Sequence, residues 1–569
     1  MEMRNLARTQ SRNIIFILVL AFALLAIVAP VTAVLYRSLL DGAGHFVGLS
    51  NFIAYFSNPV LSQPVYNSIG LGLIVTFITC VTAFAYAYGI TRSCVPGKAF
   101  FSTLALVPIL APSLLPAISL IYMFGNQGFL RSWLQGHSIY GPIGIVLSQV
   151  FFCFPYAFLI LVTALGQSDA RLFESARVLG AGSFRIFRTI TLPNISYGLV
   201  SACFVVLTIS VTDFGAVKVI GGQTNVLALD IYKQVLGQHN FQMGAVVSVI
   251  LLIPCILSYI ADHLARKKQS ALISARAVPF EPRRSALFDG AVFIYLALVS
   301  AFVISIVATA VLASVASFWP YNLSPTLANY RFGDFDPAGW SVYTNTVVLS
   351  LWTAAFGTVL TFVGAYLTEK GNLPAPFNSL YRFIALLPLA IPGLSLGLGY
   401  IFFFSSAHNP LQFLYGHMGV LVVCTISHYY TVPHLTAVTA LSQIDREFDE
   451  ASDALGRPWW VMLFRVTIPM CMPALVRIAS FFFVSAMTTV GAVIFLYAPQ
   501  TKVASVTVVA MDDTGDTGAA AALSLVIMAT CLAAIVFRWL AGRAIKYLTQ
   551  SWQAKGETNA AEQGRIATA

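Results

Sequence analysis

Charged residues are scarce in this chain: Asp, Glu, Lys and Arg together make up 9% of its 569 residues. A soluble globular domain carries about 25% charged residues, so the shortage excludes an ordinary water-soluble fold. Hydrophobic residues instead make up 58% of the chain, and the mean hydropathy is +0.81. We therefore expect most of the chain to lie in lipid.

Acidic residues are the scarcer kind of charge, with 22 against 32 Lys and Arg, and the formal net charge is +10. In a soluble protein such an excess would suggest nucleic-acid binding. Here the basic residues fall in short segments between apolar runs, where they normally set the orientation of a membrane protein. The sequence predicts no nucleic-acid partner.

Motifs for metal, redox or nucleotide chemistry are also missing. The eight cysteines include no C-x-x-C pair, so we expect neither a disulfide nor a metal site. No G-x-x-x-x-G-K-[ST] phosphate loop occurs, and the nearest fragment is Gly97–Lys98. No H-E-x-x-H motif or nucleophile–base pair indicates a membrane hydrolase. The sequence predicts no catalytic residue and no cofactor.

Long apolar runs are what the sequence does contain. Backbone amides find no water in hydrocarbon, so each run is predicted to be a helix in an all-α integral membrane fold. The first run, Ile14 to Tyr36, is too long for the core of a signal peptide and long enough to span a bilayer. We predict twelve transmembrane helices, at residues 14–36, 66–90, 99–124, 141–166, 197–220, 242–264, 287–316, 343–368, 379–404, 415–441, 473–497 and 518–541.

Basic residues are distributed unevenly over this topology. With the N-terminus inside, the outer loops hold six of the 32 Lys and Arg residues. Short loops rich in Lys and Arg stay in the cytoplasm, so both termini are predicted to be cytoplasmic. The chain then divides into a first six-helix half, a basic cytoplasmic linker, a second six-helix half and a cytoplasmic tail, at residues 1–264, 265–286, 287–541 and 542–569.

The two halves repeat each other in sequence. Residues 162–193 align without a gap to residues 438–469 and share eleven identities in 32 positions, where chance would give about two. Further upstream, Pro112 matches Pro392. Six crossings are an even number, so both halves enter the membrane from the same side. The repeats are therefore parallel, related by an axis along the membrane normal, and a solute path on that axis is expected.

A polar segment between the fourth and fifth predicted helices is the best-matched part of the repeat. In the first half, E-S-A-R-V-L-G at Glu174–Gly180 is followed after nine residues by I-T-L-P at Ile190–Pro193. In the second half, E-A-S-D-A-L-G at Glu450–Gly456 is followed after nine residues by V-T-I-P at Val466–Pro469. Both copies resemble the ATPase-coupling loop of ABC importer permeases, whose pattern is E-A-A, three residues, G, nine residues, I-x-L-P.

This resemblance implies the type I ABC importer permease fold, with the twelve helices as two parallel six-helix repeats. It implies ABC ATPase subunits at the coupling loops, and two similar loops suggest an ATPase homodimer. It also implies a periplasmic solute-binding protein as a partner and the bacterial inner membrane as the location. The coupling residues carried over are Glu174, Ala176, Gly180, Pro193, Glu450, Gly456 and Pro469.

Two other interpretations stay open. Six plus six parallel helices also describe proton-coupled secondary transporters, which need no ATPase. Such a transporter would leave the paired loops without a role. Alternatively, the loops are plain surface connections between spans, although this does not explain why one long spacing occurs twice.

Two stretches bear on the cargo. Both resemble the permease family for 2-aminoethylphosphonate, and this resemblance implies import of that compound or a related phosphonate. Fused double permeases also resemble importers of ferric iron and thiamine, which remain the alternatives. The stretches are T-D-F-G-A-V-K-V-I-G-G-Q-T-N-V-L-A-L-D-I-Y-K-Q-V from Thr212 and A-M-T-T-V-G-A-V-I-F-L-Y-A-P from Ala486.

Residues of the fifth helices are candidates for the transport path. Asp213 aligns with Thr489, next to Thr488, and Lys218 aligns with Ile494. A charge in a membrane span is costly and therefore suggests a function: Asp213 would meet an ammonium group and Lys218 a phosphonate. The alternative is that Asp213 caps or bonds a neighbouring helix while Lys218 extends to the membrane surface.

An acidic group follows the eleventh predicted helix. Asp512, Asp513 and Asp516 lie within six residues of one another. Charge runs of this kind are most often hydrated loops. The other interpretation is a contact for a solute-binding protein.

Overall fold

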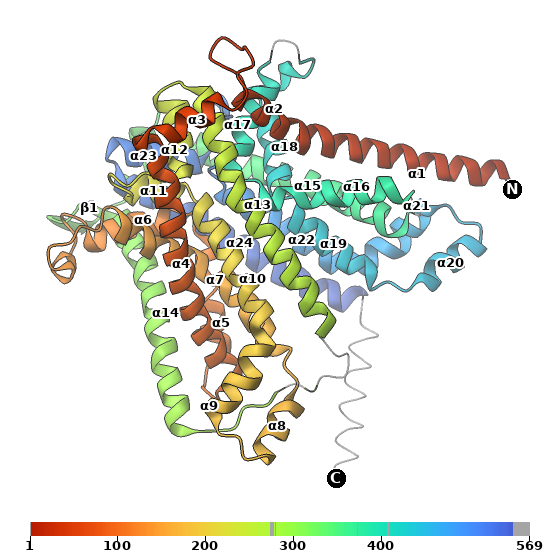
Figure 1. The fold of residues 1–569 in the computed structure, drawn as a ribbon, viewed down its shortest axis with the longest axis horizontal. Coiled ribbons are helices and arrows are strands. Elements are labelled where there is room, and N and C mark those ends of the chain that lie inside the picture. The colour runs from red at the N-terminus through yellow and green to blue at the C-terminus, as the bar shows by residue number, and fades with distance from the viewer. Residues whose placement is uncertain (1, 273–277, 279, 372–373, 407–408, 550–569) are drawn as a thin grey trace.

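The structure, a computed structural model, describes residues 2–272, 278, 280–371, 374–406 and 409–549. These residues fold almost entirely into helices (Figure 1). The two strands among them form a short antiparallel hairpin of β1 (Ala316–Phe318) and β2 (Asn322–Pro325). The predicted all-α architecture is confirmed.

Nine helical segments in the described part of the chain are long and apolar enough to span a membrane. Two further pairs of helices pass the same test together but are bent by 101° and 115°, which gives up to eleven spans. Eleven of the twelve predicted spans thus have a counterpart by this criterion, and the twelfth, residues 415–441, contains the shorter apolar helix Met418–His428. The nine segments are Ser11–Ser38, Pro59–Arg92, Pro142–Gly166, Ser183–Thr212, Phe241–Asp262, Ala286–Val315, Ser341–Lys370, Trp459–Thr488 and Thr517–Ile545.

The predicted tenth helix, residues 415–441, accounts for the difference. It is divided into α18 (Met418–His428) and α19 (Thr431–Ser442). Pro433 lies in the first turn of α19, and a proline ring inside a helix clashes with the carbonyl of the residue four positions earlier, here Tyr429. One helix therefore ends and another begins just ahead of this proline, and α18 alone has only 11 residues.

Proline also marks both bent pairs, at the positions that the repeat aligned. Ala111 before Pro112 and Ile391 before Pro392 are extended, because a following proline disfavours the helical conformation. The two halves consequently share the same sharp bend. The helices that meet at these bends are α5 (Lys98–Leu104) and α6 (Leu114–Phe124) in the first half, and α16 (Ala375–Leu386) and α17 (Gly393–Phe404) in the second.

The fifth helix of each half ends earlier than predicted. α10 (Leu192–Thr212) and α22 (Ile468–Thr488) stop before the predicted ends at 220 and 497. The residue after each helix has an extended backbone, and a glycine follows two residues later. A Cβ on Gly215 would lie 2.2 Å from Ser113 Oγ, so only glycine permits this close approach to the α6 bend.

Two other helices extend past the predicted domain boundaries. α13 (Phe241–Leu272) continues into the linker expected from residue 265, and α24 (Thr517–Thr549) continues beyond residue 541. Residues 273–277 and 279 of the linker and 550–569 of the tail lie outside the described residues. The division into halves, linker and tail stays a prediction.

The two halves form the arms of a V in Figure 1. α4 (Pro59–Arg92), α7 (Pro142–Gly166) and α10 run along one arm, and α15 (Ser341–Lys370) and α22 run along the other. The arms meet at an end that we call the apex face, which carries α11, α12, α23 and the hairpin. Their free ends carry the two repeated motifs, and we call them the motif face. The remaining helices are α1 (Glu2–Ala23), α2 (Ala29–Ser38), α3 (Ser50–Ser57), α8 (Ala170–Val178), α9 (Ser183–Ile186), α11 (Gly215–Ile220), α12 (Leu227–Tyr232), α14 (Ala286–Val315), α20 (Arg446–Ala454), α21 (Trp459–Met462) and α23 (Ala504–Thr514).

The first helix of each half packs on the opposite half. α2 lies against α17, and just ahead of α2 the Ala26 carbonyl accepts a hydrogen bond from Tyr400 Oη at 2.7 Å. α14 lies against α4 and α6 of the first half, where Tyr295 Oη donates to the Thr82 carbonyl at 2.9 Å. This exchange ties the two halves together.

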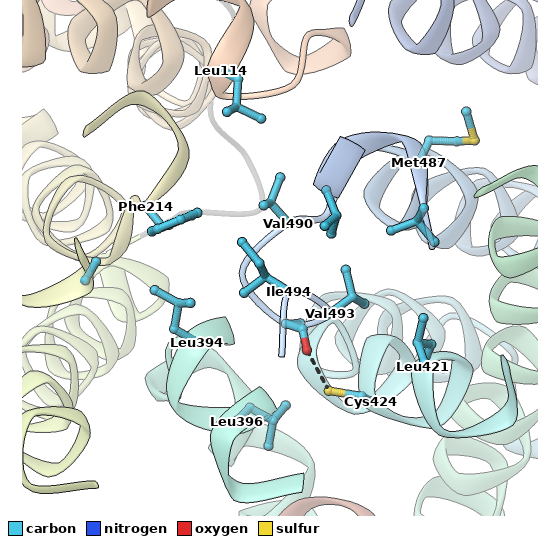
Figure 2. Close-up of a cluster of buried hydrophobic side chains, with 14 of the residues drawn as sticks. Leu114, Phe214, Leu394, Leu396, Leu421, Cys424, Met487, Val490, Val493 and Ile494 are labelled. Carbon is cyan, nitrogen blue, oxygen red and sulfur yellow. Dashed lines mark hydrogen bonds between the residues drawn. The ribbon is translucent and has the colours of Figure 1, made fainter. Parts of the chain in front are cut away.

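A cluster of buried apolar side chains closes the apex where the halves meet (Figure 2). Leu114 and Phe214 come from the first half, and Val490 and Ile494 come from the second. None of the four is more than 5% exposed. We call these four residues the apex seal, because an apolar cluster of this kind excludes water.

Candidate functional site

The two copies of the repeated motif adopt the same local structure on the motif face. α8 and α20 are short helices, and each is ended by the glycine of its motif. Gly180 has φ +76° and Gly456 has φ +64°, the left-handed conformation that glycine adopts at no steric cost. A Cβ at either position would meet no heavy atom within 4 Å, so lack of space is not the reason for the glycine. The left-handed backbone conformation is what requires glycine at both positions.

Backbone hydrogen bonds complete the same cap at both glycines. The Ala181 N–H donates to the Ala176 carbonyl at 2.9 Å, and the Arg457 N–H donates to the Ser452 carbonyl at 3.0 Å. A bond from the residue after the left-handed glycine back to the third-last helical residue defines a Schellman cap. Ala176 thus contributes its carbonyl to the cap.

The prolines of the motif follow a wide helical turn in both halves. The π-helical segments Phe187–Thr191 and Leu463–Thr467 end two residues before Pro193 and Pro469. A proline in a helix has no N–H and clashes with the carbonyl one turn back, and the wider turn relieves both problems. The spacing of the motif therefore carries the chain from the loop directly into the fifth helix.

Apolar side chains of the motif loops are exposed. Leu179 is 83% exposed and its counterpart Leu455 is 76% exposed. Glu174 and Glu450 are exposed on the same two helices. These helices lie outside the candidate spans, so lipid does not explain the exposed leucines. Large apolar groups next to charged ones on such a surface indicate a site for a partner protein.

Two cations outside the motif hold the motif helices to the arms. Arg92, at the end of α4, lies over the rings of Phe173 and Phe280 at 4.7 and 4.1 Å from their centroids. Lys370, at the end of α15, forms an ion pair with Asp449 at 2.6 Å. Phe173 and Asp449 occupy equivalent positions of the repeat. The sequence prediction missed both cations. A signal was present, because Arg92 and Lys370 are the last residues of α4 and α15, the two helices that the repeat aligns with each other.

The carboxylate of Asp213 is occupied by hydrogen bonds. Asp213 is 9% exposed and lies just beyond the end of α10, not inside a span as predicted. Gln149 Nε2 donates to it at 3.5 Å, and Ser113 and the backbone N–H groups of Gly215 and Ala216 also bond to it. This geometry matches the alternative in which Asp213 bonds neighbouring helices.

The two threonines lie at the corresponding turn of the second half. Thr488 Oγ1 donates to the Val484 carbonyl within α22 at 3.1 Å. Thr489 is buried, and its carbonyl accepts a hydrogen bond from Ser505 at the start of α23. The structure thus places both threonines at the end of α22, beside the apex seal, and their role in a path stays a prediction.

Lys218 already has a charged partner. Its Nζ lies 2.7 Å from Asp513 Oδ1, so an α11 residue of the first half pairs with an α23 residue of the second. Nζ also lies 5.2 Å from the centroid of the Tyr232 ring. The acidic group containing Asp513 was expected to be a hydrated loop or a partner contact, whereas Asp512 and Asp513 belong to the last turn of α23.

Burial and, to a smaller extent, the neighbouring carboxylate of Asp513 raise the pKa of Asp512 to about 7, although Lys218 acts in the opposite direction. Desolvation disfavours the charged form of a carboxyl, and a like charge next to it acts in the same direction. The apex face therefore carries a carboxyl that titrates near neutral pH beside an ion pair. α23 lies outside the candidate spans.

Comparison with known proteins identifies the repeat. The family described as "Binding-protein-dependent transport system inner membrane component" matches this chain twice, over residues 88–270 and 361–546. The chain belongs to this family. Each match contains one bent pair, one motif loop and one fifth helix, so this chain is a fused permease with two copies of the family domain. It is a transport subunit and not an enzyme, and in such systems the ATPase is a separate subunit.

Several permeases of known systems are similar to the chain. The ferric transport system permease protein FbpB of Actinobacillus pleuropneumoniae is 24% identical over 91% of this chain and 76% of its own length. A putative ferric transport system permease protein FbpB 1 of Haemophilus influenzae is 26% identical over 77% of this chain and 71% of its own length. The sulfate permease CysW of Synechocystis is 23% identical over 46% of this chain. A permease of this family works with an ATPase and a periplasmic binding protein.

Proposed function

We propose that this chain is the translocation subunit of an ATP-driven importer, with one ATPase subunit bound at each motif loop. The observation that carries the proposal is the duplicated geometry of α8 and α20. Both helices end in the same glycine cap, and both expose a leucine, Leu179 or Leu455, at the same position. Two equivalent docking surfaces fit two equivalent partners, hence an ATPase homodimer.

The motif face is proposed to be cytoplasmic, with both chain termini on that side. The uneven distribution of Lys and Arg supports this orientation. The apex face would then meet the periplasmic binding protein. Closure of the ATPase dimer would draw α8 and α20 together, and the two arms would rock about the apex and alternate access to a path between them.

For the cargo we propose 2-aminoethylphosphonate or a related phosphonate. The support is the resemblance of the stretches from Thr212 and Ala486 together with their place in the fold. Both stretches begin at the end of a fifth helix and lead into the apex, where a solute entering from the binding protein would pass. Ferric iron is the second candidate, because relatives that are 24% and 26% identical are named for ferric transport.

Uptake into cells with and without this chain tests the proposal. Labelled 2-aminoethylphosphonate and labelled ferric iron are supplied separately to the deletion strain, which has no redundant system, and to the strain complemented with the chain. If the chain restores uptake of one of the two compounds, that compound is identified as the cargo. If it restores uptake of neither, both candidates are overturned.

The docking part of the proposal has its own variants. Leu179→Asp or Leu455→Asp places a charge on a surface proposed to bind the ATPase, and we expect it to abolish uptake and ATPase co-purification. Leu327→Asp is the matched control, because Leu327 is 72% exposed and lies outside both motif loops and outside the candidate spans. Co-purification that survives both loop variants would refute the assigned docking surface.

A further inference from the structure

We propose that Lys218 and Asp513 form the charged latch of the apex gate, the two groups that separate when the path opens toward the binding protein. The inference rests on the proposed function, because a gate requires a transporter. Lys218 belongs to the first half and Asp513 to the second, and their side chains meet at 2.7 Å. This ion pair therefore joins the two halves.

The latch lies where the halves touch, and the arms diverge away from it (Figure 1). Neutral contacts also join the halves at this face: Tyr122 Oη lies 2.9 Å from Thr517 Oγ1, and the Trp319 indole N–H donates to the Gln127 carbonyl at 3.2 Å. The apex seal lies in the same region of contact between the halves (Figure 2). The structure is therefore closed at the apex and open between the motif loops, which is one end of a rocking cycle.

Opening the apex must separate α11 from α23, and this movement breaks the contact between Lys218 and Asp513. A hydrogen bond weakens steeply once its atoms move apart, whereas two opposite charges attract over a longer range. The ion pair therefore favours reclosure over a longer separation than the neutral contacts. Tyr232 lies on the Lys218 side, and the other charged groups close to the latch are Asp512 and Lys233.

Exposure limits the size of the effect. The side chains of Lys218 and Asp513 are 20% and 45% exposed, so water partly screens their attraction. Loss of an ion pair in such a setting shifts the ratio of closed to open apex by roughly two- to five-fold. Asp512 also interacts electrostatically with Lys218, so a variant that removes one carboxyl must also be tested with the other removed.

Thiol labelling of the seal measures apex opening directly. Val490→Cys places a thiol in the apex seal, at a position that is 5% exposed. A membrane-impermeant maleimide is applied to spheroplasts and to inverted vesicles, and the chain without Val490→Cys gives the background from its own cysteines. We expect Lys218→Gln, and Asp513→Asn combined with Asp512→Asn, to raise the labelling rate about two- to five-fold from the apex side alone.

A charge swap and a matched control separate the latch from general damage. Lys218→Asp with Asp513→Lys should restore slow labelling, which also shows that the protein folds. Glu369→Gln removes the ion pair to Arg382, which lies within the second half at 2.9 Å, and should leave labelling unchanged. Unchanged labelling in the neutral variants, or fast labelling in the swap, would overturn the latch. Labelling needs neither ATPase nor cargo, so this outcome is independent of the uptake assay.

Discussion

Replacement of Gly180 by alanine alters the backbone of the first motif helix without adding a clash. A Cβ built on Gly180 meets no heavy atom within 4 Å, while φ is +76°. The cost is therefore conformational, and the left-handed region costs an L-residue about 1–2 kcal/mol. A penalty of this size shifts the ratio of capped to frayed helix ends roughly 5- to 30-fold. The frayed end carries Leu179, which we propose to contact the ATPase.

Uptake of labelled cargo and ATPase turnover of the reconstituted complex measure the consequence. We expect Gly180→Ala to lower both at least about 5-fold. Gly180→Asn should retain most of the activity, because asparagine tolerates the left-handed cap. Gly182→Ser is the matched control: it adds a Cβ two residues away, at φ −68° and with no heavy atom within 4 Å.

Two results would refute this reasoning. If alanine and asparagine at position 180 reduce activity equally, the presence of any side chain decides the outcome and the left-handed backbone does not. If Gly182→Ser is as harmful as Gly180→Ala, the loop is sensitive to any substitution. The same pair of variants at Gly456, where φ is +64°, repeats the test in the second half.

Three further predictions concern stability and are checked by thermal unfolding of the purified protein. Lys370→Met leaves Asp449 without its partner and should cost about 1–3 kcal/mol, a loss that the double variant with Asp449→Leu should largely reverse. Asp512→Asn removes a carboxyl whose pKa is raised to about 7 in the folded protein. Because the folded protein holds this proton more tightly than the unfolded chain, wild-type stability should decrease as the pH rises from about 4 to about 7. The variant should lack this part of the decrease. Gly364→Ala places a Cβ 1.9 Å from Tyr381 Oη and should cost about 1–3 kcal/mol, unlike an alanine at Gly70, where a Cβ meets nothing within 4 Å.

The fold was predictable wherever the signal was a long apolar run or a repeat. Eleven of the predicted spans correspond to a candidate span or bent pair, because hydropathy reports burial in lipid without further context. Hydropathy does not report backbone breaks, so it joined α18 to α19 across Pro433 and extended α10 past its end. Those breaks depend on a single proline or on a close approach such as that of Gly215 to Ser113.

The motif was predictable because its residues serve the local backbone. The positive φ of Gly180 and the π-turn before Pro193 require particular residue types at fixed spacing, and such requirements survive in both halves. The contacts of Arg92 and the Lys218–Asp513 pair were not predictable, because their partners are distant in sequence and come together only through packing. A partner chosen by tertiary contact leaves no periodic pattern.

The two halves differ at the apex for a physical reason. Lys218 aligns with Ile494, and the two residues occupy different environments: the Lys218 side chain is 20% exposed beside Asp513, whereas Ile494 is 3% exposed in the apex seal. A lysine at position 494 would bury an unpaired charge among Leu114 and Phe214, which is strongly unfavourable. A symmetric pair of latches is therefore excluded by the seal itself. The two aligned positions therefore serve different contacts, an ion pair in one half and the apolar seal in the other, whereas Gly180 and Gly456 keep the same left-handed conformation in both motif loops.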